Sequence, residues 1–455
     1  RQLGVGKSFD VLYRNMEIGK KNAALYMIDG FCKDEVMQKL LQHFIGITKE
    51  QMPEDAAEMS RQLVPYGEVD LCGDLDEICR QVMSGVTALL LEGYEQGILI
   101  DARTYPARSV GEPEKDKVLR GSKDGFVETI VFNTALIRRR IRSTQLRMEM
   151  LQAGKTSHTD IVLCYMEDRV DQQFLEKIRN RIQNLQVDAL TLNQESLAEC
   201  LYQGRWWNPF PKFRFSERPD TAAAQVLEGN IIILVDNSPA AMILPSSVFD
   251  IIEEADDYYF PPLTGTYLRL TRALIALMTY FVPVLYLLST MHPTMLPDWL
   301  SFIAIKDNIN VPIILQLLIL ELALDGLRLA AVNTPNMLST PLSITAGIVL
   351  GEFSVKSGWF NSESMVYMAF IFVANYTQSS YEFGYALKFM RILTLILTAI
   401  FDFWGFAAGV ILFISSMICN KTISGYPYLY PVIPFSWKAL SRRFFRSRLT
   451  DVESK

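Results

Sequence analysis

The first 250 residues alternate short apolar segments with segments of helical spacing. Apolar runs of strand length occupy residues 23–28, 87–91, 97–101, 160–166, 230–235 and 241–244. Apolar side chains that recur every three or four positions predict helices over residues 33–44, 76–83, 172–182 and 221–227. This alternation predicts an α/β fold for the N-terminal region.

One part of this pattern occurs twice. QVMSGVTALLLEGYEQGILID from Gln81 and QVLEGNIIILVDNSPAAMILP from Gln225 align without gaps at an offset of 144 residues. Each reads as a helix end, a capping glycine, a buried strand, an acidic turn and a second strand. We therefore expect two similar α/β subdomains, residues 23–110 and 155–250. An N-terminal segment, residues 1–22, precedes them, and a helical linker, residues 111–154, joins them.

A different pattern begins at residue 270. Long apolar runs occupy residues 273–289, 311–332, 341–355, 364–377 and 386–417. The last run has 32 residues, too many for one perpendicular membrane span, so we expect it to be tilted, broken or doubled back. The fold class predicted for the whole chain is a soluble α/β N-terminal region followed by an all-α polytopic membrane domain.

Charge predicts the orientation of this domain. The chain opens without a signal-peptide pattern, and the tail, residues 434–455, is basic. Both ends are therefore expected in the cytoplasm, which requires an even number of crossings. We predict a connector over residues 251–269 and a transmembrane domain over residues 270–433. That domain is expected to have four crossings and one short non-crossing segment between residues 341 and 377. Non-helical backbone at membrane depth is tolerated against protein or a water-filled path, which favours a pore.

Three ionisable residues lie within the second apolar run. Glu321, Asp325 and Arg328 follow each other at spacings of four and three, which places them on one helical face. Ionisable groups at membrane depth face a partner or an aqueous cavity. One interpretation is that they line or gate an ion path. The other is that they pair with one another, or with Lys388 and Arg391, and lock the assembly.

The last two apolar runs add further candidates. Asp402 lies inside the final run and is the next candidate for the ion path. Gly347 with Gly351, and Gly405 with Gly409, have the spacing that lets helices approach closely. These glycines predict either helix packing or a narrow pore wall.

Four arginines end the helical pattern between the two subdomains. Arg138, Arg139, Arg140 and Arg142 could contact anionic lipid or nucleic acid, or complement the helix dipole and pair with glutamates. The net charge of −6 gives no basic field for nucleic acid. We keep these four as candidates for contacts between neighbouring subunits.

Composition limits the remaining classes of function. The chain of 455 residues is 50% hydrophobic and 21% charged, with a mean hydropathy of +0.15, which excludes a disordered chain and a wholly soluble enzyme. Six scattered cysteines and three distant histidines predict neither a disulfide framework nor a metal site. With no nucleophile–base pair in view, we expect no enzyme activity and no cofactor.

Several motifs in order along the chain resemble the GerA family of spore germination proteins, A-type subunits. They are DGFVE at 124–128, NTALIRRRI at 133–141, SERPD at 216–220, VDNSP at 235–239, DDYY at 256–259, MHPTMLP at 291–297, SSYEFGYALKFMR at 379–391 and GYPYLYP at 425–431. Ser122 and Thr294-Met295 depart from the usual family pattern and, with SFDVLYR and LYMIDGF near the N-terminus, resemble the stage V sporulation protein AF branch.

The resemblance implies a multi-pass protein of the spore inner membrane whose soluble domain faces the core. It implies a homo-oligomer, expected as a pentamer, that contacts lipid and other germination membrane proteins and conducts monovalent cations out of the core. The alternative within the family is a nutrient germinant receptor A subunit, which would act as a signal-transducing scaffold with B and C partners.

Overall fold

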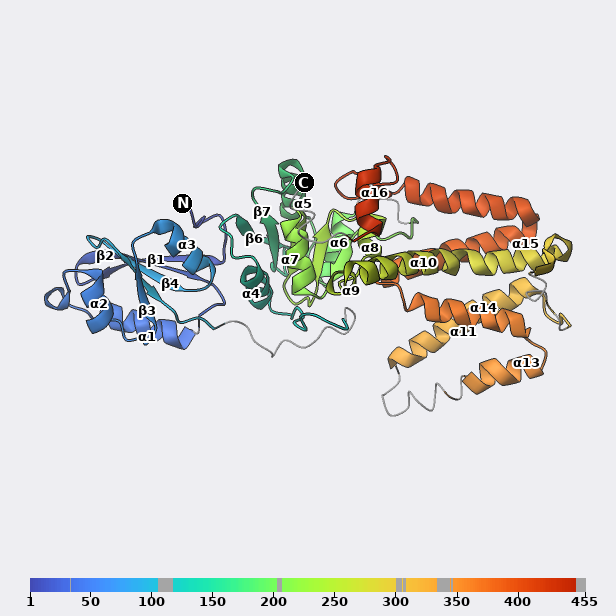
Figure 1. Cartoon of the computed structure of the whole chain (residues 1–455), viewed down its shortest axis with the longest axis horizontal. Helices are drawn as coiled ribbons and strands as arrows, with labels where there is room; N and C mark the ends of the chain where they lie inside the picture. Colours follow the sequence, from blue (N-terminus) through green and yellow to red (C-terminus); the bar gives the residue numbers. More distant parts are fainter. Residues whose placement is uncertain are drawn as a thin grey trace. The chain divides into compact units, whose positions relative to one another are not determined.

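The chain divides into two compact units, each described here by itself (Figure 1). Unit 1 comprises Arg1–Gly204 and Phe213–Pro245, and unit 2 comprises Arg205–Lys212 and Ser246–Lys455. The computed structural model describes residues 1–32, 34–104, 118–202, 207–299, 305, 308–333, 344 and 347–446. The chain therefore passes between the units three times, at residues 204–205, 212–213 and 245–246.

The first half of unit 1 is a five-stranded antiparallel sheet with helices. Its strand order is β1-β2-β4-β5-β3. The strands are β1 (Val11–Ile18), β2 (Lys21–Ile28), β3 (Val69–Cys72), β4 (Thr87–Leu91) and β5 (Gly97–Ile100). The helices are α1 (Asp34–Ile45), η1 (Lys49–Gln51), α2 (Ala56–Gln62) and α3 (Leu75–Met83).

The second half of unit 1 repeats this arrangement with the order β6-β7-β9-β10-β8. The strands are β6 (Leu146–Ala153), β7 (Thr159–Met166), β8 (Arg214–Ser216), β9 (Ile231–Val235) and β10 (Ala241–Leu244). The helices are α4 (Ile130–Arg140), α5 (Gln172–Gln183), α6 (Gln194–Leu201) and α7 (Pro219–Leu227).

The predicted duplication is confirmed in both sheets. The segment α3–β4–β5 and the segment α7–β9–β10 begin and end at positions that differ by the same 144 residues. Gly85 and Gly229 end the two helices with positive φ, 103° and 95°. In each copy the amide of the next residue donates to the carbonyl of the residue five positions earlier, Val86 to Gln81 and Asn230 to Gln225. Both helices thus end in the same glycine-dependent cap.

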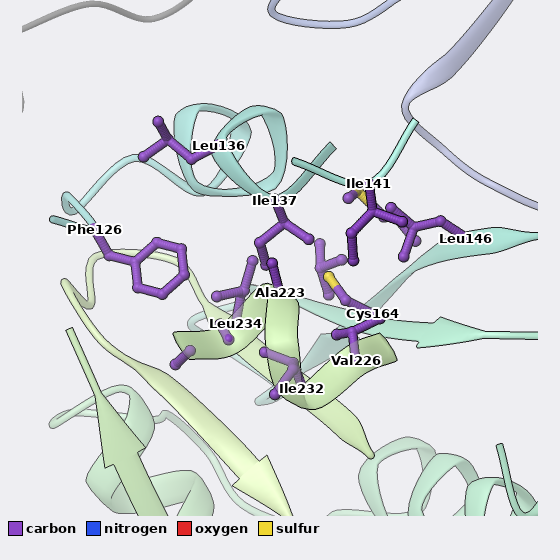
Figure 2. Close-up of a cluster of buried hydrophobic side chains, with 14 of the residues drawn as sticks. Phe126, Leu136, Ile137, Ile141, Leu146, Cys164, Ala223, Val226, Ile232 and Leu234 are labelled. Carbon is purple, nitrogen blue, oxygen red and sulfur yellow. The ribbon is translucent and has the colours of Figure 1, made fainter. Parts of the chain in front are cut away.

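Helix α4 lies between the two halves of unit 1 (Figure 1). Leu136 and Ile137 belong to the core of the second half, and Figure 2 shows Ile137 pointing toward Ala223 of α7. Ala135 belongs to a core cluster of the first half, together with Phe31. The sequence between the repeats therefore supplies an apolar helix that both halves use.

Two strands occupy segments that were expected to lie outside the subdomains. β1 pairs with β2 from Val11–Ile28 to Ile18–Lys21, within the expected N-terminal segment. β6 pairs with β7 from Leu146–Met166 to Ala153–Thr159, within the expected linker. β1 and β6 are edge strands that mix polar and apolar residues, so neither gives the continuous apolar run of a central strand.

Unit 2 is helical among its described residues. Its elements are α8 (Val248–Ile252), α9 (Asp256–Tyr259), α10 (Pro262–Met291), η2 (Pro293–Met295), α11 (Ile313–Asn333), the π-helical turn η4 (Gly347–Phe353), α13 (Ser354–Lys356), α14 (Ser362–Asn375), α15 (Tyr381–Ile418) and α16 (Trp437–Phe444). The apolar run expected at residues 341–355 is described at residue 344 and from Gly347 onward; its other residues lie outside the described ranges.

Helix α15 doubles back on itself, one of the three outcomes expected for the long final run. Asp402 has φ 57° and ψ −134°, and it separates two helical halves. A Cβ on Gly405 would collide with the Leu397 carbonyl, and one on Gly409 with the Thr394 side chain. Such contacts require the second half to run back along the first, because 15 residues of straight helix would separate residues 394 and 409 by about 22 Å.

Among the described residues, α10 and α15 are long enough and apolar enough in composition to cross a membrane. α11 has 21 residues but carries Glu321, Asp325 and Arg328. The core of unit 2 joins these helices through buried side chains, including Val284 of α10, Leu317 of α11 and Leu395 of α15. Its apolar helices and their shared core fit a membrane-associated domain.

Candidate functional site

A cluster of charged residues joins α11 to α15 inside the helical unit. Arg391 of α15 lies 2.5 Å from the Glu321 carboxylate through Nη2 and also donates to it through Nε at 2.7 Å. Lys388, one turn earlier, pairs with Glu321 at 3.5 Å and with Asp325. Spacings of four on α11 and three on α15 place these groups on facing helical surfaces.

The cluster also reaches a third helix. Arg391 Nη1 donates to the Thr279 carbonyl of α10 at 2.8 Å. The Thr279 carbonyl can accept this bond and still keep its hydrogen bond within the helix, because a carbonyl oxygen can accept two hydrogen bonds. One arginine therefore connects α10, α11 and α15.

Burial is uneven across the cluster. The Arg391 side chain is 0% exposed and that of Glu321 is 5% exposed, whereas Asp325 is 33% exposed. Removing one partner of a buried ion pair costs about 3–5 kcal/mol, because it leaves an uncompensated charge. The Glu321–Arg391 pair is thus a strong constraint on the helices, and Asp325 is the edge of the cluster that opens to the surface.

Arg328, the third charged residue of α11, has aromatic neighbours. Its guanidinium carbon lies 5.2 Å from the Tyr376 ring centroid and 5.5 Å from that of Tyr385. A guanidinium over an aromatic face contributes about 0.5–2 kcal/mol. The structure therefore holds Arg328 against the C-terminal side of α14 and the start of α15.

Asp402 does not join this cluster. It lies at the reversal of α15, where His292 Nε2 is 2.7 Å and 2.8 Å from its two carboxylate oxygens. His292 follows the last residue of α10, so this contact ties the end of α10 to the turn of the hairpin. The sequence indicated no role for His292. Its only signal there was that Asp402, an ionisable group in an apolar run, needs a partner.

The two glycine pairs have different surroundings. Gly405 and Gly409 pack the second half of α15 against the first, which is the close helix approach expected of them. At Gly347 and Gly351 an added Cβ would meet no described atom within 4 Å. Both glycines lie within η4, and they remain candidates for contact with another chain.

The four arginines of the α4 region also separate. Arg138 is fully buried and pairs with Asp10 at 2.7 Å, so it lies inside unit 1 and the expectation that it contacts a neighbouring subunit is wrong for this residue. The reason is that Asp10, just before β1, brings a buried carboxylate to it. Arg140 pairs with Asp124 at 3.1 Å, and Arg139 and Arg142 are exposed.

A segment contributed by the α/β sequence packs in the helical unit. Phe210 is 2% exposed, and its ring lies 6.4 Å from Phe383, 6.0 Å from Phe413 and 6.3 Å from Tyr428. Asn208 donates to the Ser416 carbonyl at 3.1 Å. Nothing in the sequence indicates that the partners of this proline-rich loop lie in both halves of α15.

The described chain offers few side chains that could bind a metal ion. Within the described ranges, no three His, Cys, Asp or Glu side chains are arranged to hold a metal ion. The six cysteines are free thiols, and burial raises the pKa of the Cys164 thiol well above its usual range. A thiol that stays protonated is a poor nucleophile and a poor metal ligand.

Comparison with known proteins covers the whole chain. Residues 2–455 match the family described as Bacillus/Clostridium GerA spore germination protein. The chain is 37% identical over 441 residues to stage V sporulation protein AF of Bacillus subtilis (strain 168), covering 96% of this chain and 89% of that protein. It is 27% identical over 443 residues to the uncharacterized membrane protein YfkQ of the same organism, covering 96% and 86%.

A solved structure is also similar. It is the crystal structure of the N-terminal domain of the A subunit of the Bacillus megaterium spore germinant receptor GerK3, with 26% sequence identity and a TM-score of 0.41 over 53% of this chain and 91% of that chain. The family match from end to end, with the 37% identity over nearly the full length, shows that this chain belongs to the GerA family of spore germination proteins.

Proposed function

We propose that the chain is a membrane subunit of an oligomeric channel that releases monovalent cations from the spore core during germination. The observation that carries this proposal is the charged cluster of Glu321, Asp325, Lys388 and Arg391 inside an apolar helical unit. Apolar packing in place of a buried ion pair is often neutral or stabilising, so stability alone does not account for it. Ionisable groups inside membrane segments commonly mark ion routes.

The members of the cluster are assigned different roles. Glu321 and Arg391, both sealed from solvent, hold α11 against α15 and α10 in a closed arrangement and form the gate. Asp325, with its exposed side, is the carboxylate that meets a permeating cation. Arg328 would repel cations. Its position over the rings of Tyr376 and Tyr385 holds that positive charge to one side of the proposed ion path.

The exposed position of Asp325 is the reason to propose an oligomer. A carboxylate at the surface of one subunit lines a path only where neighbouring copies enclose it, and closed rings are the usual symmetry of identical subunits. We propose a ring of five, as the family resemblance implies, with Gly347, Gly351 and the exposed Arg139 and Arg142 as contact candidates. His292 and Asp402 form a second gating element at the hairpin.

The setting proposed for this ring is the spore inner membrane. The unit containing the two antiparallel sheets would face the core, and other germination membrane proteins would associate with the ring. The basic tail, with Lys438, Arg442 and Arg443, supports this orientation, because basic segments stay on the cytoplasmic side.

Potassium release from spores tests the proposal. Spores carrying D325N should release potassium several-fold more slowly after germination is triggered, since the carboxylate that attracts the cation is gone. The matched control is E352Q, which removes a carboxylate whose ion pair with Lys356 is exposed on the same unit. Equal release by D325N, E352Q and unchanged spores, at equal protein levels, contradicts the assignment of Asp325.

A test of the proposed gate requires a variant that still folds. E321Q alone leaves Arg391 buried without a counter-charge, whereas E321Q/R391Q removes both charges and keeps hydrogen-bonding groups in place. Spores with the double variant should lose potassium before any germination signal. Full retention of potassium by the double variant, with normal release afterwards, would exclude a gating role.

The second candidate is a receptor A subunit that acts as a signal-transducing scaffold with B and C partners. The packing of Phe210 between both halves of α15 favours it, since a segment from the α/β sequence could pass a signal to the helices. In this case F210A would delay germination, while D325N would leave potassium release unchanged.

A further inference from the structure

The C-terminal helix α16 lies across the direction of α10, at the end where α10 begins (Figure 1). The Arg446 amide donates to Thr266 Oγ1 at 3.1 Å, and Arg269 Nη1 donates to the Arg443 carbonyl at 3.2 Å. Arg443 also pairs with Asp250 of α8 at 2.5 Å. These contacts fix α16 to the first turns of α10.

The first turns of α10 are where the helix changes from polar to apolar. Arg269 pairs with Glu253 at 2.9 Å and Arg272 pairs with Asp257 at 3.0 Å, and all four side chains are nearly buried. Beyond Arg272 the helix continues without a charged residue to its end. A helix fastened at this level of a membrane-spanning helix lies at the boundary between water and hydrocarbon.

The exposed side chains of α16 and its flanking residues combine aromatic rings with cations. Phe435, Trp437 and Phe445 are 68%, 65% and 54% exposed. Lys438 and Arg442 are exposed on the same helix, and within the described chain neither makes an ion pair. Other side chains of α16 pack against the protein. The Phe444 ring, for example, meets the Phe249 ring edge to face, with 5.8 Å between the ring centroids.

We propose that α16 and its flanking residues form an interfacial anchor that binds the headgroup layer of an anionic phospholipid membrane. The crosswise helix would lie in the plane of the interface, as amphipathic surface helices do. Phe435, Trp437 and Phe445 would enter the boundary region favoured by aromatic side chains, and Lys438 and Arg442 would meet lipid phosphates. A protein partner would instead have to supply both an apolar surface and acidic groups.

Trp437 makes the anchor measurable in the full-length chain. The protein and its W437F variant are reconstituted into phosphatidylcholine vesicles with and without phosphatidylglycerol, and the emission of Trp437 is obtained as their difference. Lipids brominated near the headgroup should quench this difference signal more strongly than lipids brominated deep in the chains. Phosphatidylglycerol should shift the signal to shorter wavelength.

Charge variants separate lipid binding from other causes. K438Q/R442Q should abolish the effect of phosphatidylglycerol, whereas K155Q, at an exposed lysine of unit 1, should leave it unchanged. The proposal is overturned if neither brominated lipid quenches Trp437. This holds both if aqueous acrylamide quenches the residue and if a protein surface shields it. It is equally overturned if phosphatidylglycerol has no effect on the unmodified chain.

Discussion

Thr394 and Gly409 are in contact although they lie in the same long apolar run, 15 residues apart. The contact exists because the chain reverses at Asp402, whose positive φ is uncommon for a residue other than glycine. His292 holds that residue from the end of α10. The reversal converts what reads as a single overlong span into a helical hairpin.

Spin labels can distinguish the hairpin from a straight helix. F389C and I414C place labels at exposed positions of the two halves of α15. In the hairpin these positions are level with each other, so we expect a separation near the helix packing distance of roughly 8–10 Å plus the label arms. A continuous helix would separate them by about 37 Å. A double electron–electron resonance distance near the larger value contradicts the fold of α15.

Gly229 closes the cap of α7 with φ 95°, and an added Cβ would lie 2.8 Å from the Arg169 carbonyl oxygen. G229A should lower the free energy of unfolding by at least about 1–2 kcal/mol, the cost of a left-handed backbone for a side chain, with the collision in addition. Calorimetry of the detergent-solubilised chain measures this as a lower transition temperature for unit 1. G67A, at a site with no described atom within 4 Å, is the control and should change the transition little.

Arg138 and Asp10 form a buried ion pair that connects the start of the chain to α4. Arg138 also donates to the Leu146 carbonyl at the start of β6, and Ser8 donates to Asp10. R138A should destabilise unit 1 by about 3–5 kcal/mol, because Asp10 is left buried and charged. R61A, at the exposed end of α2, should have little effect on stability.

Amide hydrogen exchange of the full-length chain checks this expectation. Loss of protection in β1 and β6 together is the predicted result for R138A, since the pair fastens both strands. Protection equal to that of the unmodified chain in both strands would show that the pair contributes little.

Part of the fold could be predicted because buried elements carry their pattern in consecutive residues. The strands that contain Leu89, Ile98 and Ile233 are almost entirely apolar, and the glycine caps at Gly85 and Gly229 repeat at a fixed offset. β1 could not be predicted in this way, because it is an edge strand with Arg14, Asn15 and Glu17 exposed, and pairing with β2 defines it.

The site was predictable only as a set of alternatives. The face of α11 that carries Glu321 follows from helical spacing, and Lys388 and Arg391 were named as possible partners. Whether these charged side chains face partner residues or water depends on how α11 packs on α15. The contacts of Asp402 with His292 depend on a chain reversal that apolar composition does not reveal.

Electrical recording from the purified full-length chain in planar lipid bilayers tests the central claim most directly. The account predicts potassium currents from the unmodified chain, a smaller single-channel conductance for D325N, a higher open probability for E321Q/R391Q, and an unchanged conductance for E352Q. A chain that inserts into the bilayer as a ring yet carries no current, or identical currents from all four proteins, would contradict it.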